Sequence, residues 1–131
     1  MYYFEVKVQY TSSEGNSVKA SFMVNATSFS DAECKVIAEI APYANNYEVL
    51  AIKILKVFEL VDINIDNEHI YVCKVKLITI QDNGRETFKP VNIYVSADNL
   101  TEAKTAIHKE ISSRDAELVA VVETKMVGYI S

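Results

Sequence analysis

Apolar and polar residues alternate in two stretches of the chain, residues 4–8 (Phe-Glu-Val-Lys-Val) and residues 71–75 (Tyr-Val-Cys-Lys-Val). Alternation of this kind is typical of a β-strand with one buried face. Each stretch is followed by a turn, a second alternating run, a helical pattern and a long apolar run. The pattern therefore predicts that the chain uses one strand–strand–helix–strand unit twice.

The first half begins with a predicted hairpin, whose turn contains residues 14–16 (Glu-Gly-Asn), and continues with a helix. Ser30 is in position to cap the helix, and Glu33 three residues later would complete a capping box. Phe29 lies directly before this cap, where a hydrophobic staple residue is expected, and Pro42 predicts the end of the helix.

The run Tyr47–Val61 is apolar in both strand registers, and Glu117–Ile130 is its equivalent in the second half. One interpretation is a central strand buried on both faces, with a β-bulge near Lys53 that changes the register. The other interpretation is that the second face packs against another copy of the protein. The sequence leaves both open.

The second half repeats these elements after a polar connection over residues 62–69. Its hairpin turn, residues 82–85 (Asp-Asn-Gly-Arg), is a strong turn signal because Asn-Gly tolerates positive φ. We predict an α+β fold with an internal duplication of a ββαβ unit, in which two helices pack on six mostly antiparallel strands related by a pseudo-twofold. The repeats, residues 1–66 and 67–131, should share one core in one compact domain, because one repeat alone buries too little surface.

Composition limits the class of protein. Of 131 residues, 50% are hydrophobic and 24% are charged, which is typical of a globular rather than a disordered chain. A formal net charge of −5 argues against nucleic-acid binding through a uniformly basic surface. Neither an apolar run of about 20 residues nor a basic N-terminal leader is visible, so we expect a cytoplasmic protein with no membrane partner.

The sequence offers little for catalysis. Neither His69 nor His108 has a partner at metal-ligand spacing, and the glycines are too scattered for a phosphate-binding loop. Cys34 and Cys73 are expected to be free thiols, the second of them in the core. We therefore expect no cofactor, no metal and no enzymatic activity, although an active site assembled across an interface would not be visible in the sequence.

The remaining candidate is a surface on the outward side of the hairpins, where basic residues alternate with aromatic ones. Its residues are Lys7, Lys74, Lys76, Arg85, Lys89 and Tyr94. Such surfaces hold the phosphates and stack the bases of single strands. The alternative is that the lysines keep a half-exposed strand soluble and guard a sheet edge. The leading hypothesis is a non-catalytic protein that binds single-stranded DNA. The rival is a protein-interaction or scaffold module that forms a homo-oligomer through Tyr47–Val61 and Glu117–Ile130.

Almost the whole chain resembles an uncharacterised family, a domain of unknown function from gut anaerobic bacteria and their bacteriophages. The motifs that carry the resemblance are residues 3–8, 24–33, 71–75 and 121–125. Members of that family have a cysteine in both strand openings, whereas Val6 replaces the first one here, which argues against a shared cysteine function. The resemblance implies no catalytic residues. It implies a bacterial host cell and a phage or mobile-element setting, and so favours nucleic-acid handling or virion assembly.

Overall fold

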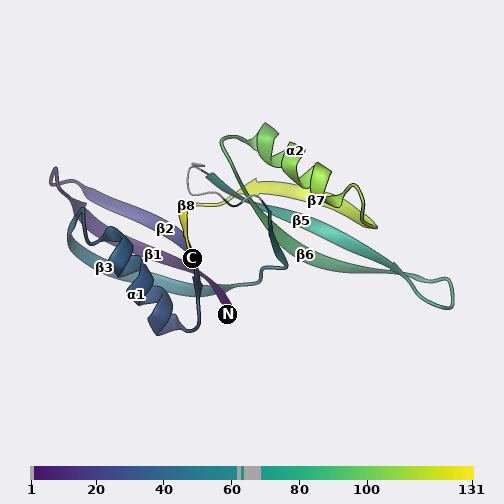
Figure 1. The fold of residues 1–131 in the computed structure, drawn as a ribbon, viewed down its shortest axis with the longest axis horizontal. Coiled ribbons are helices and arrows are strands. Elements are labelled where there is room, and N and C mark those ends of the chain that lie inside the picture. Colours follow the sequence, from purple (N-terminus) through teal and green to yellow (C-terminus); the bar gives the residue numbers. More distant parts are fainter. Residues whose placement is uncertain (1, 62, 64–68) are drawn as a thin grey trace. The chain divides into compact units, whose positions relative to one another are not determined.

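The computed structural model describes residues 2–61, 63 and 69–131 and shows an α+β protein, as expected (Figure 1). In chain order, the described residues form β1 (Tyr2–Ser12), β2 (Ser17–Ala26), α1 (Phe29–Ile40), β3 (Ala44–Leu55), β4 (Glu59–Val61), β5 (His69–Ile80), β6 (Glu86–Ala97), α2 (Leu100–Ile111), β7 (Ala116–Glu123) and β8 (Met126–Ile130). The described strands thus number eight and belong to two sheets, whereas we predicted six strands.

The additional strands arise because each long apolar run is divided. Tyr47–Val61 is not one strand: residues 56–58 separate β3 from β4, and residues 124–125 separate β7 from β8. A pattern that is apolar in both registers indicates strand-forming residues, but it does not show where a chain leaves one sheet and enters another. The prediction of a single doubly buried strand was therefore wrong.

The short final strands are exchanged between the repeats. The sheet orders are β3-β1-β2-β8 and β4-β6-β5-β7. Strand β4 pairs in parallel with β6, where Glu59 lies opposite Ile93, and β8 pairs in parallel with β2, where Gly128 lies opposite Phe22. The last strand of each repeat therefore completes the sheet of the other repeat.

Two compact units result from this exchange. Unit 1 contains Met1–Lys56 with Lys125–Ser131, and unit 2 contains Val57–Thr124. The expected repeat boundary, between residues 66 and 67, lies outside the described residues. The pseudo-twofold stays a prediction.

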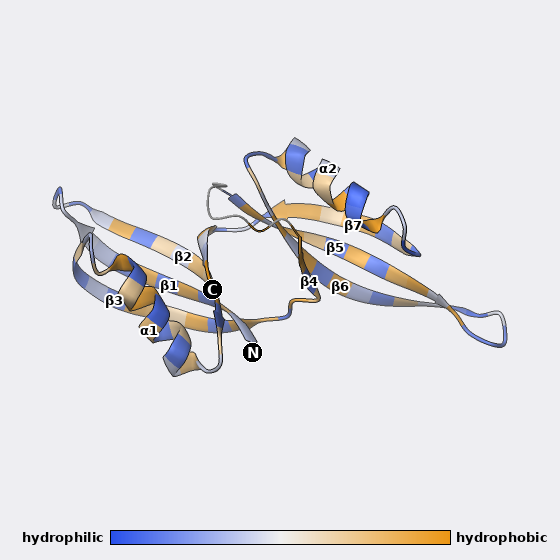
Figure 2. Cartoon of the chain, viewed as in Figure 1, coloured by the Kyte–Doolittle hydropathy of each residue, from blue (hydrophilic) through white to orange (hydrophobic). Residues whose placement is uncertain are grey.

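Each unit has its own cluster of buried apolar side chains between its helix and one face of its sheet, which differs from the single shared core that we expected. Figure 2 shows the apolar and polar residues that alternate along the strands. The helical contributions are equivalent in the two units, and the buried residues are Ala32, Val36 and Ile40 in α1 and Ala103, Ile107 and Ile111 in α2.

The β-bulge occurs in both repeats, at equivalent positions. In β3, Ala51 lies opposite Lys7 and Val49 lies opposite Val8, so that Leu50 is the additional residue. In β7, the additional residue is Val119, by the same shift beside Lys74 and Val75. We expected a bulge near Lys53; it lies three residues earlier, where the strand changes the face that its side chains occupy.

The helix caps also recur, but the predicted cap residue of α1 was wrong. The helix begins at Phe29, and its N-cap is Ser28, whose Oγ accepts from the Asp31 amide at 3.1 Å. In turn, an Asp31 carboxylate oxygen accepts from the Thr27 amide at 3.0 Å. This backbone hydrogen bond, aided by Lys35, lowers the pKa of Asp31.

In α2, Asn99 Oδ1 accepts from the Glu102 amide at 2.9 Å. A carboxylate oxygen of Glu102 in turn accepts from the Asp98 amide at 3.3 Å. Phe29 is thus the first helical residue rather than a staple before the cap. Its ring packs edge-to-face on Phe4, with centroids 4.9 Å apart.

Candidate nucleic-acid interface

Lys74 and Lys76 lie on one exposed face of the β5–β6 hairpin, as predicted. They are two residues apart in β5, so their side chains share a face. The intervening Cys73 and Val75 point to the other face and belong to the buried cluster under α2. The two lysines therefore lie on the side of the sheet opposite α2.

An exposed aromatic ring adjoins these lysines. The Nζ of Lys76 lies 6.0 Å from the centroid of the Phe88 ring, at the range of a cation–π contact. Phe88 lies opposite Ile78, so it shares the face of Lys74 and Lys76, and 55% of it is exposed. We call Lys74, Lys76 and Phe88 the basic–aromatic face. Sequence reasoning missed Phe88, although alternation along the strand puts it on the same face as Tyr94.

Two of the predicted residues do not contribute to this face. Lys89 lies opposite Leu77, a residue packed against the unit 2 core, so its side chain is on the opposite side of the sheet. Tyr94 is on the correct side, opposite Val72, but only 6% of it is exposed, and Leu60 of β4 pairs beside it. The predicted face was therefore wrong for Lys89 and correct for Tyr94, but a buried ring offers no surface for stacking a base.

Arg85 lies at the tip of the same hairpin and is exposed. The turn is formed as predicted, because Gly84 takes a φ of 80° and Arg85 donates its backbone N–H to Asn83 Oδ1 at 3.0 Å. Positive φ is accessible to glycine without steric cost. Arg85 is therefore available at the end of the hairpin.

Lys7 is exposed in unit 1, at the position that Lys74 has in unit 2. Lys7 lies opposite Ala51 of β3, as Lys74 lies opposite Ala120 of β7. Its neighbour on the same strand face, Glu5, holds Lys53 in an ion pair at 3.7 Å. The unit 1 face is thus less basic than its counterpart.

Acidic groups also limit the charge on the unit 2 face. Glu117 of β7 lies opposite Lys76, whereas Lys74 has the uncharged Asn92 and Ala120 beside it. Lys74 is therefore the position with the least local compensation of its charge. Contacts to a polyanion at this face should be few and sensitive to salt.

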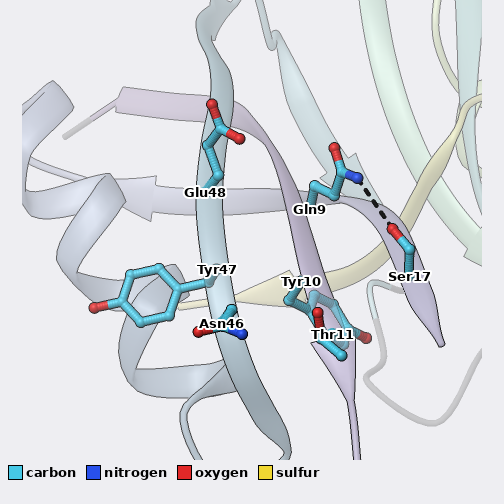
Figure 3. Close-up of a pocket in the computed structure, with 7 residues that line it drawn as sticks. All are labelled: Gln9, Tyr10, Thr11, Ser17, Asn46, Tyr47 and Glu48. Carbon is cyan, nitrogen blue, oxygen red and sulfur yellow. Dashed lines mark hydrogen bonds between the residues drawn. The ribbon is translucent and has the colours of Figure 1, made fainter. Parts of the chain in front are cut away.

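Unit 1 carries a shallow depression of about 240 Å³ near the β1–β2 turn (Figure 3). It is lined by Gln9, Tyr10, Thr11, Ser17, Asn46, Tyr47 and Glu48. The Gln9 side-chain amide donates to Ser17 Oγ at 3.0 Å, so two of the polar groups that line the depression are hydrogen-bonded to each other. None of the described residues that line it is a histidine, a cysteine or a basic residue, so these residues do not combine a nucleophile with a base.

The sequence matches the family model of DUF4494, a domain of unknown function, over residues 2–131. The chain belongs to this family. No curated protein and no solved structure matches it. The expected resemblance to a domain of unknown function is thus confirmed, while the setting in gut anaerobes and phages stays a prediction.

The titratable side chains of this DUF4494 chain do not gather into a metal site within the described residues. Cys73 is buried, and burial raises the pKa of its thiol to about 11, whereas Cys34 is exposed on α1. His69 begins β5 rather than lying in the connection, and its Nδ1 is 2.8 Å from Glu123 Oε1. We had not anticipated this carboxylate partner, because the two residues are 54 positions apart in the chain. His108 is exposed on α2, as expected.

Within the part of the chain that the structure describes, neither helix is long and apolar enough to cross a membrane.

Proposed function

We propose that this DUF4494 chain is a non-catalytic binding protein and that the basic–aromatic face of its β5–β6 hairpin binds single-stranded DNA. The observation that carries this proposal is the position of the Lys76 ammonium group beside the exposed Phe88 ring, with Lys74 on the same strand face. Phosphate contacts and a stacked base require this combination of groups.

The affinity should be modest. Each phosphate contact to a single strand contributes about −0.7 to the slope of log K against log salt, so two lysines predict a slope near −1.4. Stacking of one base on Phe88 adds about 1–3 kcal/mol at any sequence, because every base has a π-face. Arg85, at the tip of the same hairpin, provides a further positive charge in unit 2.

Fluorescence anisotropy of a labelled oligodeoxythymidylate tests the proposal at low salt. The Lys74→Glu/Lys76→Glu variant should bind about tenfold or more weakly, and the magnitude of its salt slope should fall by about 1.4. Phe88→Ala should weaken binding while the salt slope stays the same, because it removes stacking and no charge.

The matched control is Lys104→Glu/Lys109→Glu, which makes the same charge change on exposed positions of α2. Its binding should stay close to that of the wild type after correction for net charge. Absence of wild-type binding at low salt, or equal losses in both double variants, would contradict a specific interface on the hairpin.

We further propose that the protein acts in the cytoplasm of a bacterial host, in a phage or mobile-element setting. The support is the resemblance described above, which connects the family with phages and gut anaerobes. It is an argument by association.

A second candidate function is a protein-interaction or oligomeric scaffold module. It is favoured by exposed apolar side chains on the strands that lie at the sheet edges, β3 and β7. These residues are Tyr47, Leu50, Ile54, Val119 and Val122, each of which is 38–54% exposed. Exposed edge strands of this kind are templates for pairing with another chain.

A further inference from the structure

Strand β3 is a long, open edge of the unit 1 sheet. It has twelve residues and pairs with β1 on one side, at the end of the order β3-β1-β2-β8. Most of its residues are exposed. The fully buried strand residues of the unit 1 cluster come from β1 and β2, whereas the β3 residues packed against it, Val49 and Ile52 among them, are only partly buried. The outer backbone groups of β3 are therefore available for a further strand.

Charges along β3 are arranged so that the strand is complementary to itself. In an antiparallel pair of two β3 strands centred between Leu50 and Ala51, Glu48 of one copy lies opposite Lys53 of the other. The same register places Tyr47 opposite Ile54. Opposite charges and apolar pairs are the favourable cross-strand combinations, and a twofold axis makes each pair occur twice.

The faces of the sheet agree with this register. Tyr47 and Ile54 lie opposite Tyr10 and Phe4 of β1, on the side of the sheet that faces α1. Glu48 and Lys53 lie opposite Gln9 and Glu5, on the other side. Each proposed pair therefore joins two side chains on the same face, as a continuous sheet requires.

The bulge at Leu50 makes a second copy the best partner. A regular strand paired along β3 would lose its register at the bulge, because one additional residue moves all later side chains to the other face. Two copies of β3 both carry the additional residue next to the centre of the pair. Their registers therefore remain matched on both sides of it.

The equivalent edge strand of unit 2 does not have this property. The self-pairing of β7 that corresponds to that of β3 sets Glu117 opposite Val122, and a shift by one residue sets Glu117 opposite Glu123. An unpaired charge or two like charges disfavour the contact. The acidic residues of β7 thus guard that edge, whereas the opposite charges of β3 do not.

From these observations we infer that the chain forms a homodimer by antiparallel pairing of β3 with β3 of a second copy. The interface is one strand wide and lies at the small end for specific complexes, so the dissociation constant should be about micromolar. The inference does not depend on nucleic-acid binding, because the basic–aromatic face belongs to unit 2 and β3 to unit 1.

Sedimentation equilibrium of the full chain over a range of concentrations tests this dimer. The mass should rise with concentration from 14.7 kDa to twice that value and no further. Glu48→Lys and Lys53→Glu should each weaken the dimer about tenfold, because each creates two like-charge pairs. The double variant Glu48→Lys/Lys53→Glu exchanges the charges, so it should recover most of the wild-type affinity.

The control is Glu117→Lys, the same charge change at the equivalent position of β7, which should leave the dimer unchanged. Circular dichroism checks that each variant is folded, and Lys74→Glu/Lys76→Glu should dimerise like the wild type. A monomer at every concentration, assemblies larger than a dimer, a double variant no better than the single ones, or an equal loss in Glu117→Lys would each overturn the inference.

Discussion

The guanidinium group of Arg114 donates to both carboxylate oxygens of Glu59, with nitrogen–oxygen distances of 2.7 and 2.9 Å. Glu59 lies on β4, the strand that the first repeat contributes to unit 2, and Arg114 follows α2. A further bond of 2.6 Å joins Arg114 to Glu110 of that helix. Arg114 thus connects β4 with α2 through a bidentate ion pair to Glu59 and a bond to Glu110. Lysine cannot reproduce this bidentate geometry.

Arg114→Lys should therefore destabilise the protein. Both side chains of the pair are about one-third exposed, at 31% and 32%, so solvent screens the interaction. We expect the free energy of unfolding in urea to fall by about 0.5–1 kcal/mol. Arg85→Lys, at the exposed hairpin tip, is the matched control and should change nothing. Equal effects of the two substitutions would show that the forked contact does not contribute.

The same pair predicts a dependence on pH. The hydrogen bonds and charge of Arg114 lower the pKa of Glu59 from its ordinary value of 4.5. A carboxyl group whose pKa is lower in the folded state contributes stability above the unfolded value, and this contribution is lost as pH falls through the folded value. The stability difference between wild type and Glu59→Gln should thus be constant above about pH 5 and should shrink below about pH 4. Urea unfolding across this range measures it, and a difference independent of pH would contradict the assignment.

The N-cap of α1 gives a prediction with an internal control. Ser28→Ala removes the oxygen that accepts from the Asp31 amide and should cost about 1 kcal/mol of unfolding free energy. Ser30→Ala lies in the first helical turn and should be neutral or slightly stabilising, because alanine has the higher helix propensity. Thermal or urea unfolding of the two variants decides between the caps. A larger loss at Ser30 would restore the cap that the sequence pattern suggested.

This error at the cap shows what the sequence can determine. Ser28 and Ser30 both precede an acidic residue by three positions, so the local pattern fits either of them. The strands, turns and helices were predictable because alternation, Asn-Gly turns and helical spacing are local signals. The positions of β4 and β8 were not predictable. These strands have only three and five residues, too few to show a periodic pattern, and they pair with strands of the other repeat.

The candidate site was predictable to a similar extent. Alternation placed Lys74 and Lys76 on the correct face, but it could not show that the position of Tyr94 on that face is buried. Lys89 was misplaced although alternation along β6 alone puts it on the face opposite to Tyr94. The same alternation puts Phe88 on the face of Tyr94. What alternation along one strand cannot show is that Leu60 of β4 pairs beside Tyr94.

The two cysteines should differ in reactivity. Cys34 is exposed, whereas Cys73 is buried and burial raises the pKa of its thiol to about 11. Only the thiolate reacts rapidly with disulfide reagents. In native protein at about pH 8, a chromogenic disulfide should therefore label Cys34 alone, and denaturant should release the second thiol. Cys34→Ser should abolish the rapid reaction. Fast labelling of two thiols in the folded wild type would show that the unit 2 core opens readily.

Gly128 tests whether β8 pairs with β2 in solution. A Cβ atom at Gly128 would lie 3.3 Å from Cδ1 of the Phe22 ring, which is itself buried. In an unpaired strand, Gly128→Val would be neutral or favourable, because valine has the higher β propensity. In the paired strand, the larger side chain must displace the Phe22 ring, and overpacking costs about 1–3 kcal/mol. The sign of the change therefore reports the pairing.

Val127→Ala, at a neighbouring position that is 54% exposed, should have little effect. Destabilisation by Gly128→Val in urea unfolding, with Val127→Ala near neutral, is the result expected if the last strand completes the sheet of the first repeat, because only the paired arrangement brings Phe22 against position 128.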